Sequence, residues 1–148
     1  MNLLSWNARG LGDPRAVDKL RMLIRKSSPS LVFISETKLA GRAALVIKER
    51  VGFSSSIQVD STGRSGGLLL MWNDDLEVSL KSFSSHHIDI DVTDGRGLQW
   101  RYTGVYGEPI RGQRWQFWEL LRRLQMVNSL PWLVSGDFNE IVSLIEKK

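Results

Sequence analysis

The chain has 148 residues, 42% of them hydrophobic, which suits one domain with a substantial buried core. It contains no cysteine, which excludes a disulfide framework and any thiolate metal site, and its net charge of +4 mildly favours an anionic partner such as nucleic acid. No segment reaches the roughly 20 apolar residues of a membrane span, and the first residues do not resemble a signal peptide, so we expect an intracellular protein without a membrane partner.

The first part of the chain predicts strands that alternate with helices. Asp13 is a good helix N-cap, Pro14 suits the first helical position, and Gly52 is a typical helix end. The apolar run LVFIS is typical of a strand that is buried on both faces. In chain order we expect a strand at 2–6, a helix at 14–25, a strand at 31–35, a helix at 42–52 and an edge strand at 53–59.

The second part predicts hairpins, followed by a helix and a last strand. The predicted elements are strands at 66–72, 76–83, 86–92 and 98–107, a helix at 111–127 and a strand at 132–135. The four strands joined by short polar turns indicate an antiparallel meander. Crossovers combined with hairpins predict a layered α/β fold in one domain, residues 1–148. The last strand has the composition of a central strand, so either helices enclose it or the chain lacks a piece.

Polar side chains stand at the ends of several predicted strands. They are Asn7, Glu36, Tyr106, Asp137 and Asn139. In layered α/β sheets, ligands bind where the carboxyl ends of strands converge, so these groups suggest one site. Oxygen donors such as those of Asn7 and Glu36 suit Mg²⁺, and an aspartate that holds a water can act as a general base.

Each of these residues can also have an ordinary structural role. Asn7 can open a turn, Glu36 can be an exposed acid at a helix start, the segment GDFN can be an Asx turn, and Tyr106 can be a half-buried hairpin aromatic. Spacing alone therefore leaves both interpretations open.

The histidines and the helix tryptophans predict packing more than chemistry. His86 and His87 are adjacent on a predicted strand, so one points inward and one outward, and they cannot hold a metal together. We expect one surface histidine and one buried, hydrogen-bonded histidine. Trp115 and Trp118 recur with Leu121 and Gln125 along one helix face, as in core packing. The basic first helix is typical of a solvated face, although the loop at 7–12 can face phosphates.

Six segments carry a resemblance: LLSWNARGLG, LVFISETKL, SGGLLLMW, HHIDIDV, YTGVYGEP and LVSGDFNEI. In order and spacing they resemble the endonuclease/exonuclease/phosphatase superfamily. More narrowly, they resemble the endonuclease domain of LINE-type (non-LTR) retrotransposons that are common in plant genomes. The resemblance implies a DNase I-like, four-layered α/β sandwich of two mixed sheets with outer helices, whose second half would be incomplete in this chain.

The resemblance also implies an activity, the hydrolysis of the DNA phosphate backbone with Mg²⁺ or Mn²⁺. It places Asn7 and Glu36 at the metal-site positions and Asp137 where a residue activates the attacking water. Asn139 falls on the partner that orients this water, and Tyr106 on a tyrosine that contacts the scissile phosphate. A DNA substrate would be consistent with a nuclear location.

The chain also departs from the family's pattern. Family members continue past GDFNE to a Ser-Asp-His motif whose histidine stabilises charge at the phosphate, and we expect this chain to lack that part. Arg9 replaces an acid of repair-type relatives, which favours the retrotransposon type. We therefore expect little activity, and an apolar sheet face left exposed by the missing half. The alternatives are a non-catalytic remnant that binds nucleic acid or nothing, and a phosphatase that acts on small phosphoesters.

Overall fold

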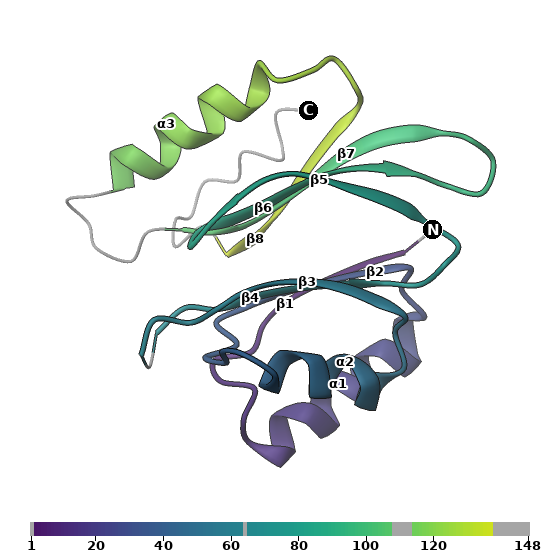
Figure 1. Ribbon diagram of the computed structural model, residues 1–148, viewed down its shortest axis with the longest axis vertical. Coiled ribbons are helices and arrows are strands. Elements are labelled where there is room, and N and C mark those ends of the chain that lie inside the picture. The colour runs from purple at the N-terminus through teal and green to yellow at the C-terminus, as the bar shows by residue number, and fades with distance from the viewer. Residues whose placement is uncertain (1, 64, 108–113, 138–148) are drawn as a thin grey trace.

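The computed structural model describes residues 2–63, 65–107 and 114–137, without the side chains of 114–117 and 137, and shows two β-sheets with helices on their outer sides (Figure 1). The elements in chain order are β1 (Leu3–Asn7), α1 (Pro14–Ser27), β2 (Leu31–Ser35), α2 (Ala43–Val51), β3 (Ser55–Val59), β4 (Leu68–Trp72), β5 (Glu77–Ser84), β6 (His87–Thr93), β7 (Gln99–Tyr106), α3 (Arg114–Gln125) and β8 (Trp132–Asp137). Every predicted element is present, with ends shifted by at most three residues.

Each sheet contains four of the described strands, including one parallel pair at an edge. The first sheet has the order β1-β2-β4-β3, with β1 parallel to β2 and β4 antiparallel to both of its neighbours. The second sheet has the order β5-β6-β7-β8, an antiparallel meander to which β8 is added parallel to β7. The expected meander is therefore wrong in its first strand. β4 belongs to the first sheet because, like β2, it is an apolar strand buried on both faces.

The two sheets pack face to face around a closed apolar core. Phe33 of β2 lies edge-on to Tyr102 of β7, with 6.2 Å between ring centroids. Gly104 makes room for this contact, because a Cβ there would lie 2.4 Å from the Phe33 ring. The buried residues of this core are Leu31, Phe33, Leu68, Leu70, Leu76, Ile88, Ile90, Val92 and Tyr102. The expectation of an exposed apolar sheet face is therefore wrong, because each sheet covers the inner face of the other.

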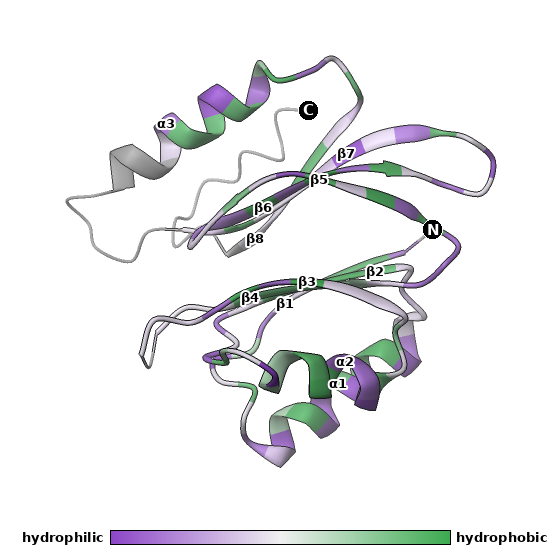
Figure 2. Cartoon of the chain, viewed as in Figure 1, coloured by the Kyte–Doolittle hydropathy of each residue, from purple (hydrophilic) through white to green (hydrophobic). Residues whose placement is uncertain are grey.

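The helices cover the outer faces of the sheets and complete the four-layered arrangement predicted by the resemblance. α1 and α2 lie on the first sheet and α3 on the second (Figure 1). Hydrophobic and hydrophilic residues alternate along α1 and α2 (Figure 2), as expected for helices with one face on a sheet. Asp13 caps α1 by accepting the backbone N–H of Arg15, and Gly52 ends α2 in the left-handed conformation, as predicted.

α3 packs on the second sheet through a face that differs slightly from the predicted one. Leu121 and Leu124 are buried against this sheet, and Trp118 packs beside them, which confirms a core role for this tryptophan. Gln125 is exposed, because Leu124 occupies the position that faces the sheet. The side chain of Trp115 lies outside the described residues.

A buried polar network ties α3 and β8 to the second sheet. Arg101 of β7 donates two hydrogen bonds of 2.8 Å to the carboxylate of Asp89 on β6, and a third, of 2.5 Å, to the carbonyl of Leu124. The Thr103 hydroxyl donates to Asp89 and accepts from the indole N–H of Trp132, both at 2.8 Å. Because a buried charge is costly without its partners, this network holds the start of β8 beside β7.

Within the described residues, β8 pairs only with β7 and forms an edge of its sheet, as β1 does in the first sheet. The two edge strands lie against each other across the sandwich. Val134 of β8 is buried beneath α3, so this helix covers the outer face of β8. None of the described helices is long and apolar enough to span a membrane.

Candidate functional site

The carboxyl ends of the two parallel strand pairs meet at one hollow. Asn7 at the end of β1 lies opposite Ser35 of β2, and Glu36 follows directly. Tyr106 at the end of β7 lies opposite Asp137 at the end of β8. The hollow is lined from both sheets, by Ser5, Trp6, Asn7, Ser35 and Gly136. Asn7 therefore shares this hollow with the residue that precedes Asp137.

Asn7 and Glu36 are in direct contact. Asn7 Nδ2 donates a 2.8 Å hydrogen bond to Glu36 Oε1, and Asn7 Oδ1 accepts the backbone N–H of Arg9 at 3.1 Å. Because that N–H can only face an acceptor, the orientation of the Asn7 amide is fixed, with its nitrogen toward the carboxylate. Both side chains are half-buried, and Asn7, which lines the hollow, holds the Glu36 carboxylate through this hydrogen bond.

The loops that follow β1 and β2 are joined by their backbones. The N–H of Gly10 donates to the carbonyl of Glu36, and the N–H of Leu11 donates to that of Thr37, both at 2.8 Å. The position of Asn7 beside Glu36 is therefore set by paired main chains as well as by the side-chain contact.

Backbone strain is concentrated in the same two loops. In the described residues, left-handed φ values at non-glycine positions occur at Arg9 (53°), Glu36 (51°) and Lys38 (57°), and otherwise only at Ser28, which ends α1. The Lys38 turn is held by a 2.9 Å bond from its N–H to the carbonyl of Gly66. Such conformations cost about 1–3 kcal/mol each and often mark functional sites.

β8 reaches the hollow through a glycine at which any side chain would clash with the neighbouring backbone. Gly136 has a φ of 136°, and a Cβ there would lie 1.9 Å from the carbonyl oxygen of Val105. The preceding residue, Ser135, is in hydrogen-bond contact with the Tyr102 hydroxyl, with 2.7 Å between the two oxygens. Burial raises the pKa of the Tyr102 hydroxyl, which therefore stays protonated and joins β7 to β8.

Tyr106 is packed against a histidine. His86 Nδ1 is 3.0 Å from the carbonyl oxygen of Tyr106, the Tyr106 N–H donates to the His86 carbonyl at 2.8 Å, and the two rings are nearly parallel, 7° apart. His86 is thus half-buried at the end of β7, a neighbour that sequence reasoning missed. The pairing of the predicted strands 86–92 and 98–107 across a short turn is the signal that could have revealed it.

His87 is the buried, hydrogen-bonded histidine that the sequence predicts. Its side chain is 3% exposed, with Nε2 2.9 Å from Ser82 Oγ and Nδ1 2.7 Å from Ser84 Oγ. Burial lowers the pKa of His87, which favours the neutral ring.

A second hollow beside Asn7 is rich in positive charge. It is lined by Trp6, Asn7, Ala8, Arg9, Arg15, Ala16 and Lys19. Its three cations are exposed, and Arg15 makes a 3.4 Å ion pair with Asp13. An exposed ion pair of this kind is weak, so the hollow remains cationic and suits an anionic group close to Glu36.

The oxygen donors at the site are few. In residues 2–63, 65–107 and 114–136, no group of three or more histidine, aspartate or glutamate side chains is placed to share a metal. The donors are the carboxylate of Glu36 and the amide oxygen of Asn7, which already accepts the N–H of Arg9, so the predicted metal role of Asn7 is secondary to its contact with Glu36. Mg²⁺ and Mn²⁺ prefer such oxygens, and Mg²⁺ keeps several waters, so these donors fit a single ion held mainly by Glu36.

The structure thus brings some predicted site residues together and leaves others aside. Asn7 and Glu36 are bonded to each other, and Tyr106 and Asp137 are paired across neighbouring strands. The side chain of Asp137 and the whole of Asn139 lie outside the described residues.

Comparisons with known proteins bear on the family and the fold. The chain matches the model of the Endonuclease/Exonuclease/phosphatase family over residues 4–148. No curated protein sequence matches the chain. Among solved structures, TDP2 from Caenorhabditis elegans has a TM-score of 0.71 at 17% identity, over 97% of this chain and 49% of that protein. The AP endonuclease LMAP from Leishmania major has a TM-score of 0.66 at 15% identity, over 93% of this chain and 54% of that protein.

The 3'-5' exonuclease NExo from Neisseria meningitidis is also similar, with a TM-score of 0.62 at 18% identity, over 94% of this chain and 58% of that protein. The chain therefore spans about half the length of these structures, and at such identities the likeness shows the fold. With a family model matched over nearly all its residues and the same fold as these enzymes, the chain belongs to the Endonuclease/Exonuclease/phosphatase family.

Proposed function

We propose that the chain is part of a DNA endonuclease domain of the LINE retrotransposon type, which hydrolyses phosphodiester bonds with Mg²⁺ or Mn²⁺. One observation carries this proposal: Asn7 and Glu36 are bonded to each other at a hollow that β8 lines from the opposite sheet, through Gly136. The retrotransposon type is supported by the six sequence segments and by Arg9.

We propose a role for each residue from the resemblance and, where the structure describes it, from its contacts. Glu36 would hold the metal, and Asn7 positions the Glu36 carboxylate. Asp137, at the end of β8, accepts a proton from the attacking water, which Asn139 orients. Tyr106 contacts the scissile phosphate, and His86 fixes the Tyr106 backbone and ring. When bound, the metal would polarise the phosphate and neutralise charge.

The cationic hollow beside Asn7 supports an anionic substrate. Arg9, Arg15 and Lys19 offer positive charge next to Glu36, which otherwise repels phosphate. Arginine and lysine contacts to phosphates position a nucleic acid without reading its sequence. We propose that this hollow takes the DNA backbone next to the scissile bond.

We also propose that the activity is low. The sequence contains two histidines; His87 is buried, and His86 is bonded to the Tyr106 carbonyl. The resemblance implies a histidine that stabilises charge on the phosphate. We assign this role to neither of the two. Loss of one such donor costs about 10²–10³-fold in rate.

Nicking of supercoiled plasmid DNA at high protein concentration tests the proposal. We expect slow nicking that requires Mg²⁺ or Mn²⁺ and disappears in Glu36→Gln and in Asp137→Asn. Glu77→Gln, which removes an exposed acid on β5, is the matched control and should nick like the wild type. Equal nicking by Glu36→Gln would contradict the proposed site, and DNA binding without any nicking would favour a non-catalytic remnant.

A further inference from the structure

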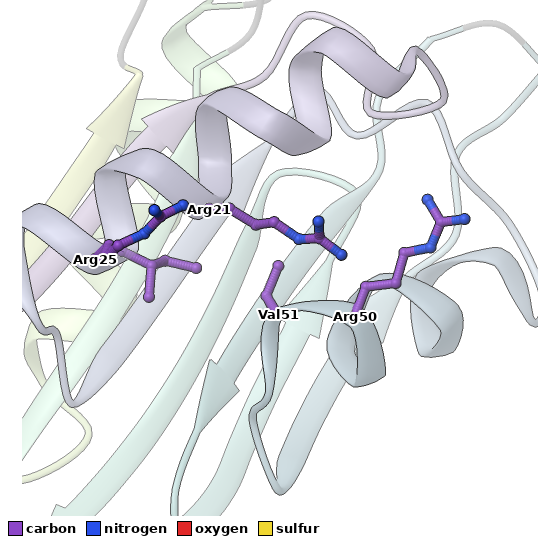
Figure 3. A pocket seen from close by; sticks show the side chains of 5 residues that line it. Arg21, Arg25, Arg50 and Val51 are labelled. Atoms are coloured by element: carbon purple, nitrogen blue, oxygen red, sulfur yellow. The ribbon is translucent and has the colours of Figure 1, made fainter.

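Three arginines share a hollow on the outer helix layer, apart from the candidate site. Arg21 and Arg25 lie one turn apart on α1, and Arg50 lies in the last turn of α2. The hollow between the two helices is lined by these arginines together with Ile24 and Val51 (Figure 3). It has no lining residue in common with the two hollows beside Asn7.

The charges of these arginines are not neutralised within the described part of the chain. All three side chains are exposed, and none of them forms an ion pair there, although Asp18 and Glu49 are close along the same helices. Like charges one turn apart on a helix destabilise it slightly. Arg25 and Arg50 lie near the C-terminal ends of their helices, where a positive charge interacts favourably with the helix dipole. Arg21 lies a turn earlier and does not benefit from this interaction.

The arrangement of the guanidinium groups indicates the shape of the ligand. In Figure 3 they follow one another from Arg25 through Arg21 to Arg50 and do not converge on one point. A single small anion would meet one of them, whereas a chain with repeated negative charges can meet all three. The guanidinium fork matches phosphate oxygens in a bidentate way, and lysine does not.

The floor of the hollow is apolar. Ile24 and Val51 are half-buried and pack against the core beneath the helices, and Val51 lies between Arg21 and Arg50 in Figure 3. A nucleic-acid backbone alternates phosphates with partly apolar sugars. Its phosphates can contact the arginines while its sugars lie on the apolar floor. We infer that Arg21, Arg25 and Arg50 form a second nucleic-acid site, which binds backbone phosphates away from the proposed catalytic groups.

Fluorescence anisotropy with a short labelled DNA duplex tests this inference, with EDTA present so that no cleavage occurs. The triple variant Arg21→Gln/Arg25→Gln/Arg50→Gln should bind more weakly than the wild type. The slope of log K against log salt should fall in magnitude by about 2–3, since each phosphate contact contributes roughly 0.9.

The matched control is Arg42→Gln/Arg96→Gln/Arg123→Gln, which removes the same charge from three exposed arginines in separate parts of the surface. It should change the slope by much less. Equal losses in the two triple variants would overturn the inference, because net charge alone would then account for the binding. So would unchanged binding by the first triple variant.

Two further measurements distinguish this site from the catalytic hollow and from a membrane-binding surface. Glu36→Gln should keep the wild-type slope, so failure of the proposed catalytic site would leave this inference standing. Binding to vesicles that contain phosphatidylserine is the competing outcome. If the first triple variant loses vesicle binding and keeps DNA binding, the ligand is a membrane surface and the inference is wrong. Melting curves of both triple variants should match the wild type, because only exposed side chains change.

Discussion

Removal of Arg101 should destabilise the protein more than any surface substitution. Arg101 is 1% exposed and Asp89 is fully buried, and the two share two hydrogen bonds of 2.8 Å. Arg101→Met leaves the Asp89 carboxylate with the Thr103 hydroxyl as a hydrogen-bond donor but without its cation, and it deprives the Leu124 carbonyl of its donor. An uncompensated buried charge of this kind costs about 3–5 kcal/mol.

The size of the effect on melting follows from the size of the domain. Each kcal/mol lowers the Tm by about 2–4 °C in domains of about 150 residues, so Arg101→Met should lower it by about 6–20 °C. The double variant Asp89→Val/Arg101→Met replaces the pair with apolar side chains of similar summed volume. It should be more stable than Arg101→Met, because no charge is left buried.

Thermal and urea unfolding of the wild type, Arg101→Met and the double variant check this reasoning. A loss below about 1 kcal/mol in Arg101→Met would place it in the range of exposed ion pairs and refute the buried network. A double variant that is less stable than Arg101→Met would show that the cost does not come from the charge of Asp89.

Three further predictions concern the sheets and one histidine. Gly136→Ala should cost about 1–3 kcal/mol or more, because its Cβ would overlap a backbone carbonyl, whereas Gly95→Ala, with nothing within 4 Å, should be neutral in urea unfolding. Gly104→Ala should be destabilising, and adding Phe33→Leu should recover part of the loss; additive losses would contradict their contact. Burial lowers the pKa of His87 below its ordinary 6.5, so as the pH falls through 6.5 the unfolded chain binds a proton that the folded chain does not, and stability declines. His87→Gln should therefore flatten the fall in Tm between about pH 7 and pH 5, and an unchanged slope would count against a buried neutral ring.

Local patterns were sufficient to predict most elements and part of the candidate site. Asp13 begins α1 through a cap by its own side chain, and Gly52 ends α2 because glycine, which has no Cβ, readily adopts the left-handed conformation. Asn7 ends β1 and Glu36 directly follows β2, and the polar loops that come next mark both strand ends clearly in the sequence. Parallel pairing of the two strands then brings both residues to one edge. Such features depend on a few neighbouring residues and can be deduced from sequence.

Choices between distant partners could not be predicted in this way. Along the chain, β4 comes after the other strands of the first sheet and before the meander, with similar turn signals on both sides, so its sheet is decided by its pairing with β2 and β3. The closed core also depends on pairs such as Phe33 and Tyr102, which no local pattern connects. The contact between His86 and Tyr106 depends on hairpin register, where one residue of slip changes the face.

Paramagnetic broadening by Mn²⁺ in NMR spectra of the labelled protein tests most directly whether the site is a metal site. If Glu36 holds the ion, backbone signals of Asn7, Glu36 and Gly136 should broaden first, and Glu36→Gln should abolish this effect. Broadening that begins instead at exposed acids remote from the hollow, such as Asp74 and Asp75, and leaves those three signals sharp, would contradict the proposed site.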